Sequence, residues 1–235
     1  MVLAFRRQRR RQVSDGSLLV VWALLGILYI ARGVTGFVDD ARYNDALDAR
    51  SDPRPYWPDA FTISFNETTS IPLLSDTTTG VLYYDSSRNA ERVDRAEGRG
   101  DRYCGSVHPL KHTPCTHVAI RGMRYLVFPE LKTCCSCCSF AAGCGPLTPT
   151  WLNNATYVPP AAGSDSSIDC FNVHGLQNNI FCQYSGSHAP LRLSQGKIDD
   201  TYYDVSTFVE GHPDPSVFEL PSTCTTKCGG ICRFL

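Results

Sequence analysis

The stretch GVLYYDSSRNAERVDR, residues 80–95, contains the clearest fold signal in the chain. Residues 80–85 are rich in β-branched and aromatic side chains, and the charged run 90–95 follows the tetrapeptide Ser86-Ser87-Arg88-Asn89. Serine and asparagine favour turns because their side chains bond to nearby backbone groups. We therefore predict a β-hairpin with one solvated face.

Similar strand-like segments occur on both sides of this hairpin. Apolar residues alternate with polar ones through residues 61–65, and further short strands are predicted at 118–120, 123–128, 171–173, 180–184, 191–193, 202–209 and 217–220. Beyond the first 36 residues there is no convincing amphipathic helix and no internal repeat. Many short strands at regular spacing predict an all-β sandwich or barrel.

The N-terminus predicts entry into the secretory pathway. Five arginines occur before residue 12, and an apolar run, LLVVWALLGILYIA, occupies residues 18–31. This is the pattern of a signal peptide, and the run is short for a transmembrane helix. We predict a signal peptide or signal anchor at 1–36, a leader at 37–59, and one disulfide-stapled all-β domain at 60–235. The protein is then secreted, lumenal in a lysosome or vacuole, or anchored at the cell surface.

Charge and sequons fit this route. Without residues 1–36, Lys+Arg falls from 22 to 16 and Asp+Glu from 23 to 22, which leaves a net charge of −6. An acidic surface argues against nucleic acid as a partner. Asn66 and Asn154 each begin an N-x-T sequon, so we predict glycosylation at both.

All twelve cysteines lie in the predicted lumenal part. In an oxidising compartment an even number at this density indicates disulfides. Adjacent cysteines rarely bond each other, so the pairs in CCSCC, residues 134–138, are expected to reach four different places. Sequence does not give the connectivity. The predicted disulfide cysteines are Cys104, Cys115, Cys134, Cys135, Cys137, Cys138, Cys144, Cys170, Cys182, Cys224, Cys228 and Cys232.

Three other chemistries have weaker support. The C-x-x-C spacings in 134–138, and the cluster Cys104, His108, His112, Cys115 and His117, could hold zinc in a reducing compartment; we predict no metal. The three histidines could instead sense acid, although the simpler interpretation is that they are loop histidines without a functional role. Asp199, Asp200, Asp204 and Glu210 could bind calcium, but they lack the spacing of a calcium loop. The charged residues 88–102 are interpreted as a solvated strand face with weak ion pairs.

The order of landmarks resembles that of ependymin-related proteins. The landmarks are Tyr83-Tyr84-Asp85 with Asn89, Arg92, Asp94 and Gly98, and a closing run from Asp199 through Val205 and Val217 to Cys224. The same order recurs in amino-terminal domains of some papain-like proteases of protists. The resemblance implies a curved antiparallel half-barrel of the lipoprotein-carrier (LolA-like) type, in secreted or lysosomal glycoproteins that bind a lipid. This chain has additional cysteines, which could brace the cavity mouth or fill it.

We therefore predict an apolar small molecule or lipid as the ligand, held by burial of apolar area, with no cofactor, no catalytic residue and no enzymatic activity. A membrane surface or a protein is a further possible partner. The alternative is a secreted or surface-anchored interaction module with a fully packed core. The predicted ligand-binding residues, placed on concave or core-facing sides, are Phe61, Phe65, Tyr83, Tyr125, Val127, Phe171, Tyr184 and Tyr203.

Overall fold

The structure is a computed structural model that describes residues 53–71, 74–161, 163, 165–175, 178–196 and 198–235. They belong to one compact unit, Arg50–Leu235. The predicted signal segment 1–36 and the leader up to residue 52 lie outside the described residues, so both stay predictions. No helix in the described part combines the length and apolar character that a membrane crossing requires.

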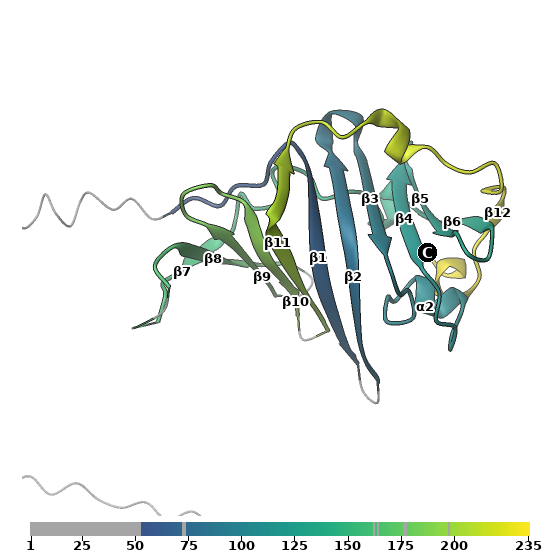
Figure 1. The fold of residues 1–235 in the computed structure, drawn as a ribbon, viewed down its shortest axis with the longest axis horizontal. Coiled ribbons are helices and arrows are strands. Elements are labelled where there is room, and N and C mark those ends of the chain that lie inside the picture. The colour runs from purple at the N-terminus through teal and green to yellow at the C-terminus, as the bar shows by residue number, and fades with distance from the viewer. Residues whose placement is uncertain (1–52, 72–73, 162, 164, 176–177, 197) are drawn as a thin grey trace, which may run out of the picture. The chain divides into compact units, whose positions relative to one another are not determined.

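The described residues form one open, curved sheet of twelve strands, in the order β12-β6-β5-β4-β3-β2-β1-β11-β10-β9-β8-β7 (Figure 1). All neighbours pair antiparallel except β12, which runs parallel to β6. The predicted fold class, a disulfide-rich all-β protein with a curved antiparallel sheet, is confirmed. The strands are β1 (Ala60–Ile71), β2 (Leu74–Asp85), β3 (Ala90–Arg95), β4 (Cys115–Ile120), β5 (Met123–Phe128), β6 (Thr133–Ser139), β7 (Thr156–Val158), β8 (Ile168–Val173), β9 (Asn179–Tyr184), β10 (Pro190–Gln195), β11 (Asp199–Glu210) and β12 (Thr226–Lys227).

Short helical turns lie between the strands and after β12. They are η1 (Ser86–Arg88), α2 (Cys104–Val107), η2 (Phe140–Ala142), η3 (Pro215–Phe218) and η4 (Gly230–Arg233). The segment 217–220, predicted as a strand, overlaps η3 instead. Pro215 fixes the first turn and Asp214 accepts a hydrogen bond from the Ser216 N–H, so the backbone bends before Phe218 enters the core.

The predicted hairpin joins β2 to β3 through a turn that Asp85 closes. This carboxylate is fully buried and accepts hydrogen bonds from Ser87 Oγ at 2.6 Å and from Arg88 N and Nε at 3.2 and 3.0 Å. Asn89 then takes the left-handed conformation, with φ of 47°, which asparagine tolerates better than most residues. Burial alone raises the pKa of Asp85, but hydrogen bonds from Ser87, His212 and Arg88 lower it below its usual value.

Strand register divides the side chains between two faces, because directly opposed residues in antiparallel strands share a face. We call inner the face on which Phe61, Ile63 and Phe65 gather, and outer the opposite one. Phe65 lies opposite Gly80 on β2 and Tyr203 on β11. A side chain at position 80 would collide with the Phe65 ring and the Asp94 carbonyl, so glycine lets that ring lie across β2.

The inner face is largely filled by the protein's own aromatic side chains. Trp57 packs edge-to-face on Phe61 at 5.1 Å, on Trp151 at 5.5 Å and on Phe181 at 5.7 Å. Tyr56 is also tied to the sheet, because its N–H donates to the Gln183 side chain at 2.8 Å. The described end of the predicted leader, residues 53–59, therefore contributes to the core rather than only leading to it.

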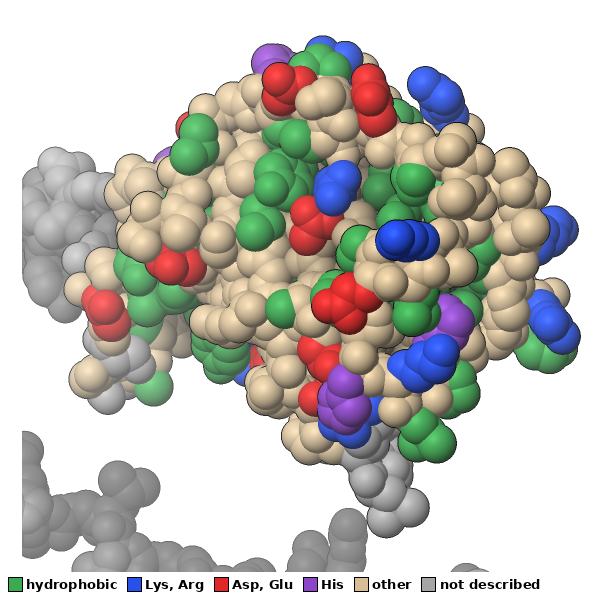
Figure 2. Space-filling model, turned by 45° about the vertical axis from the view of Figure 1, so that its right-hand side comes forward, with side chains coloured by type: hydrophobic (Ala, Val, Ile, Leu, Met, Phe, Trp, Pro, Cys, Tyr) green, Lys and Arg blue, Asp and Glu red, His purple; other side chains and the backbone are tan. Residues whose placement is uncertain are grey.

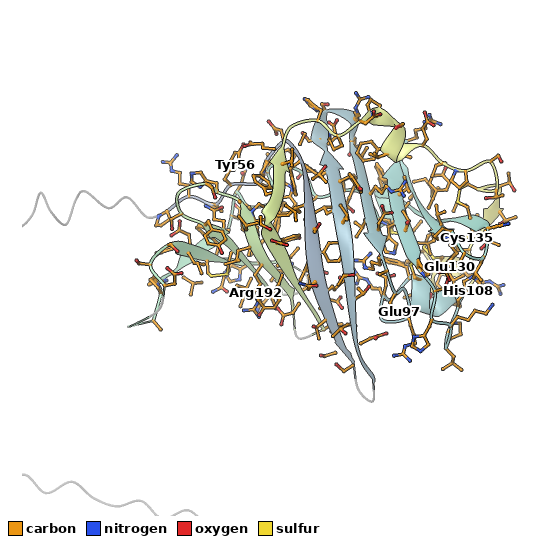
Figure 3. The ribbon with its side chains drawn as sticks, viewed as in Figure 1. Tyr56, Glu97, His108, Glu130, Cys135 and Arg192 are labelled. Atoms are coloured by element: carbon orange, nitrogen blue, oxygen red, sulfur yellow. A yellow bond between two sulfur atoms is a disulfide. The ribbon has the colours of Figure 1, made fainter. Side chains whose placement is uncertain are left out.

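Three disulfides fasten the C-terminal tail to the cysteine block. The block forms β6, which was not predicted as a strand, and the bridges are Cys134–Cys224, Cys135–Cys228 and Cys137–Cys232. Figure 3 shows Cys135 at this edge of the sheet, beside the tail. The sequence of this block shows no alternation of apolar and polar residues, because cysteines point to both faces of β6. Three of its four cysteines bond to the tail.

Three further bridges act locally. Cys104–Cys115 joins α2 to β4, Cys138–Cys144 closes a short loop after β6, and Cys170–Cys182 links opposed residues of β8 and β9. All twelve cysteines are thus paired, and the four of the CCSCC block reach four different places, as expected. Apart from Cys134, Cys224 and the β8–β9 pair, the cysteines pack with Leu126 and Phe128 in a second buried cluster.

Candidate functional site

A cavity of about 310 Å³ remains on the inner face of the sheet. One wall is apolar, formed by side chains from β1, β2, β10 and β11 and from the segments before β1 and after β6. Its principal members are Trp57, Phe65, Leu82, Leu147, Leu193 and Tyr203. A concave site of this size, partly apolar, lies at the lower end of the range for small-molecule pockets.

The predicted ligand-binding residues divide into three groups. Phe65 and Tyr203 line the cavity. Phe61 and Phe171 also point inward, but they are fully buried in the core beside it. The other four, Tyr83, Tyr125, Val127 and Tyr184, lie on the outer face.

The outer placement follows from the register. Tyr83 lies between Leu82 and Tyr84, which both belong to the inner core, and a strand alternates its faces. The same alternation turns Tyr125 and Val127 away from Leu126, and Tyr184 away from Gln183. Placing these four on the concave or core-facing side was wrong, because both faces of the sheet carry aromatic residues.

Another part of the cavity lining, which we call the charged wall, consists of charged side chains that were not predicted from the sequence. Arg95 donates to Glu67 with Nε at 2.6 Å and Nη2 at 3.2 Å, and its Nη1 lies 3.7 Å from Asp101 Oδ2. The side chains of Arg95 and Glu67 are each 11% exposed and that of Asp101 is 9% exposed. Burial alone lowers the pKa of Arg95, but the charges of Glu67 and Asp101 raise it.

The interpretation of residues 88–102 as a solvated face was therefore half wrong. Arg92 and Asp94 do pair on the outer face, at 2.9 Å and about one-third exposed. Residues 91, 93 and 95 alternate with them and point into the cavity. The signal in the sequence was that charged residues occupy adjacent positions, at 91–92 and again at 94–95, because strand alternation requires one member of each pair to face inward.

His117 is held neutral between two partners. Arg124 Nη1 lies 3.2 Å from His117 Nδ1 and can only donate, so Nδ1 accepts and Nε2 carries the hydrogen. Nε2 then donates to Asp101 Oδ1 at 3.0 Å. Burial lowers the pKa of His117. For Asp101, burial alone raises the pKa, but His117, Arg95 and the Cys104 N–H lower it well below the usual range.

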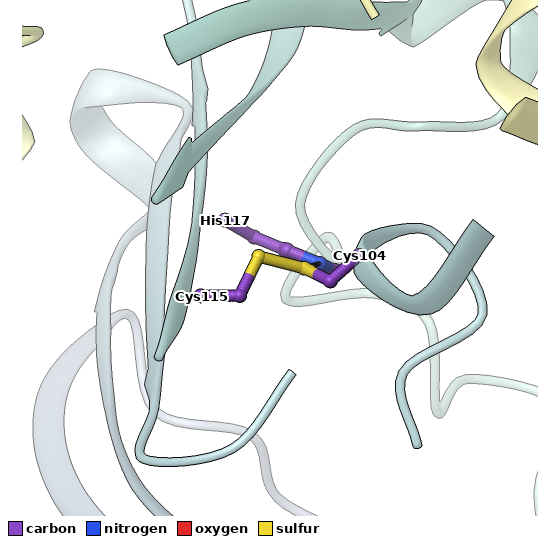
Figure 4. Close-up of side chains that lie close together, drawn as sticks. All are labelled: Cys104, Cys115 and His117. Atoms are coloured by element: carbon purple, nitrogen blue, oxygen red, sulfur yellow. Dashed lines mark hydrogen bonds between the residues drawn. A yellow bond between two sulfur atoms is a disulfide. The ribbon is translucent and has the colours of Figure 1, made fainter. Parts of the chain in front are cut away.

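Cys104, Cys115 and His117 lie together beside this wall (Figure 4), and their ligand atoms are within 4.8 Å of one another. The two sulfurs are bonded to each other, so neither is available as a thiolate ligand. The other histidines of the suspected zinc cluster lie apart: His108 packs on the Phe128 ring at 4.5 Å, and the exposed His112 pairs with Glu97. The suspected calcium ligands also separate, because Asp199 lines the cavity while Asp200 pairs with Arg192 on the outer face.

Asp199 is the carboxylate of the cavity wall that makes no salt bridge to an arginine or lysine among the described residues. Burial and the charges of Glu67 and Asp101 raise its pKa, while a hydrogen bond from Thr69 and the charge of Arg102 lower it. A partly buried acid without a paired cation is costly to stability and is more common at functional sites than elsewhere.

Asp199→Asn is therefore expected to raise the melting temperature at neutral pH by a few degrees, since about 1 kcal/mol corresponds to about 2–4 °C in a domain of this size. The raised pKa means that the folded state favours the protonated acid, so the wild type gains relative stability as the pH falls through that pKa. The advantage of the variant should disappear in acid. Thermal melts at several pH values check this, and a variant that melts below the wild type at neutral pH would contradict it.

Both predicted glycosylation sites, Asn66 on β1 and Asn154 in the loop before β7, are exposed. Their use stays a prediction. The face drawn in Figure 2 carries both acidic and basic side chains, and the basic ones do not gather into one patch. Arg192, labelled in Figure 3, stacks on the exposed Tyr202 at 5.1 Å.

The chain matches no protein-family model and no curated protein. Solved structures similar to it include an uncharacterized conserved protein from Thermus thermophilus, with a TM-score of 0.42, 9% identity, and coverage of 71% of this chain and 88% of that chain. A LolA superfamily protein from Nitrosomonas europaea has a TM-score of 0.35 and 7% identity, over 71% of this chain and 92% of the other. A DUF1329 family protein from Desulfovibrio piger has a TM-score of 0.35 and 9% identity, over 76% and 94%.

The TM-scores of these structures are too low to establish a family. The resemblance to ependymin-related proteins and to protease amino-terminal domains stays a prediction.

Proposed function

We propose that this chain is a secretory-pathway binding protein that holds an apolar or amphipathic small molecule in the inner cavity of its curved sheet. The cavity itself is the observation that carries this proposal. It is set into an aromatic core, and its apolar wall comprises Phe65, Leu82, Leu193 and Tyr203 together with Trp57. Burial of apolar ligand surface there contributes about 25 cal/mol per Å².

The disulfides support the proposed compartment. Six bridges in one domain require an oxidising environment to form and persist, which the secretory pathway supplies. The exposed sequons at Asn66 and Asn154 are compatible with glycosylation on that route. We propose no covalent chemistry for the site.

A neutral fluorescent probe, N-phenylnaphthylamine, tests the binding. We expect saturable fluorescence enhancement with the wild type, and affinity about tenfold weaker or worse in Val93→Phe, because the larger ring occupies part of the cavity. Val127→Phe makes the same change on the outer face and should bind as the wild type does. Circular dichroism on both variants verifies that they are folded.

The competing function, an interaction module without a small ligand, is favoured by one observation. Trp57, Trp151 and Leu152 already fill much of the inner face. If the wild type fails to bind the probe, or if Val93→Phe binds as tightly as the wild type, the inner cavity is not the binding site and the interaction module becomes the better account.

A further inference from the structure

The outer face of the sheet carries a second hollow, which the proposed function does not use. It has a volume of about 640 Å³ and crosses the sheet from β11 through β1, β2 and β3 to β4. We call it the outer groove. Its lining includes Asn66, Thr79, Val81, Asp94 and Thr116.

Strand register places these side chains in two neighbouring rows. Asn66 lies directly opposite Thr79, while Val81, Asp94 and Thr116 lie opposite one another in the next row. Directly opposed side chains have Cβ atoms about 4.5–5.5 Å apart, and diagonal neighbours such as Asn66 and Val81 are about 7–8 Å apart. The side chain of Asn66 therefore opens into the groove beside Val81.

The lining combines carbon surface with polar groups that solvent can reach. Val81, Pro114 and Pro129 contribute apolar atoms. Arg92 and Asp94 pair at 2.9 Å but stay 29% and 32% exposed, so they keep capacity for further hydrogen bonds. A sugar ring has C–H faces and a rim of hydroxyl groups, and both parts of it find a matching surface in this groove.

The chain carries an attachment point for a sugar inside the groove itself. Asn66 is exposed and begins the sequon Asn66-Glu67-Thr68. Its neighbour Phe65 is buried on the inner face, so strand alternation directs the side-chain amide of Asn66 to the outer face. A glycan on this amide starts within the groove, whereas one on Asn154 starts beside β7, the edge strand at the far end of the sheet.

We propose that the first two N-acetylglucosamine residues of an N-linked glycan on Asn66 occupy the outer groove. Neighbouring strands are about 4.8 Å apart, so two sugar rings that start on β1 extend over β2 and β3. There a C–H face lies on Val81, and hydroxyl groups bond to Asp94. The glycan covers apolar surface that is otherwise open to solvent. This inference depends on use of the Asn66 sequon and is independent of any ligand in the inner cavity.

Trimming by endoglycosidase H tests this placement, because the enzyme cuts between the first and second N-acetylglucosamine. The full chain is expressed in a eukaryotic host that attaches high-mannose glycans, and mass spectrometry of glycopeptides follows the two sites separately. We expect native trimming at Asn66 to be about tenfold slower than at the exposed Asn154, and the two rates to become equal after denaturation. Equal native rates, or an Asn66 without a glycan, would overturn the proposal.

A variant pair separates the groove from the strand position of Asn66, because a glycan within a strand can be trimmed slowly for steric reasons alone. Val81→Lys places a long side chain in the groove opposite Asp94, and should raise the native trimming rate at Asn66 about fivefold or more. Ile180→Lys makes the same kind of change at an exposed position of β9, outside the groove, and should leave the rate unchanged. Circular dichroism verifies that both variants are folded. Slow trimming that persists in folded Val81→Lys would overturn the proposal.

Discussion

Replacement of Arg95 by methionine is expected to lower the free energy of unfolding by about 3–5 kcal/mol, the usual cost of removing one partner from a buried ion pair. Methionine approximates the length of the arginine stem, so the loss comes mainly from charge. Glu67 loses two hydrogen bonds and Asp101 loses its nearest arginine, while both stay buried. Urea denaturation of the wild type and the variant measures the difference.

The difference should depend on pH in a defined direction. The pKa of Asp101 is lowered in the folded protein, so its contribution to stability is present above the unfolded-state pKa of about 3.9 and is lost as the pH falls through the folded-state pKa. Arg95→Met raises the pKa of this carboxyl because one of the groups that lower it is lost, while His117 and the Cys104 N–H remain. The gap between the wild type and the variant should therefore be largest at neutral pH and should narrow as the pH falls below about 4.

Arg192→Met is the matched control. Arg192 also donates twice to a carboxylate, Asp200, but on the outer face, where the two side chains are 32% and 38% exposed. Solvent screening limits such pairs, so we expect a loss of about 1 kcal/mol or less, with little pH dependence. Equal losses of unfolding free energy in the two variants would show that the inner ion pair is as well solvated as the outer one. That result would contradict the burial of the charged wall.

The second large effect is the loss of unfolding free energy when the three bridges to the C-terminal tail are removed. We expect the losses from the individual bridges to be strongly non-additive. Each closes a loop with a sequence separation of 90, 93 or 95 residues. With the other two in place, removing Cys135–Cys228 reopens only a short ring, at a cost of about 2 kcal/mol in the loop-entropy treatment. Removing the last of the three opens the whole loop and should cost about 4–5 kcal/mol.

Alanine pairs introduced one, two and three bridges at a time, followed by urea denaturation, measure this series. Cys170→Ala with Cys182→Ala is the comparison, because its short loop, with a separation of 12 residues, lies at the opposite end of the sheet from the tail. Its cost, about 3 kcal/mol, should be the same in the wild type and in a background that lacks one tail bridge. Equal, additive losses along the tail series would contradict loop closure as the origin of the stabilisation.

Local pattern was enough to predict the strands that alternate and the turn between them. The hairpin of β2 and β3 was predicted because the tetrapeptide Ser86-Ser87-Arg88-Asn89, which favours a turn, separates two strand-like segments. The block that forms β6 and the turn at Pro215–Phe218 escaped this reasoning. In β6 the repeated cysteines hide the period of two. At Pro215–Phe218 a short apolar run is compatible with a strand as well as with a helical turn.

The candidate site was predicted only in part, and the residues show why. Phe65 and Tyr203 do line the cavity, and their contact with a ligand stays a prediction. Tyr83 and Tyr125 were predicted there for their aromatic character and lie on the outer face. Arg95, Glu67 and Asp101 were not suspected, since a charged residue in a strand is normally solvated. Their burial depends on each other, and they come from β1, β3 and the loop before α2.

The sequence by itself thus determined an all-β, disulfide-rich domain, because alternation, turn residues and an even number of cysteines are properties that the chain carries locally. Only the tertiary structure decided which face is inner, which cysteines pair and which charges are buried. A period of two places neighbours on opposite faces without stating which face is covered, and a disulfide or a buried ion pair requires two groups to approach within a few ångströms. That proximity is created by the curvature and register of twelve strands together, and residues 67, 95 and 101 become one wall only when the sheet has formed.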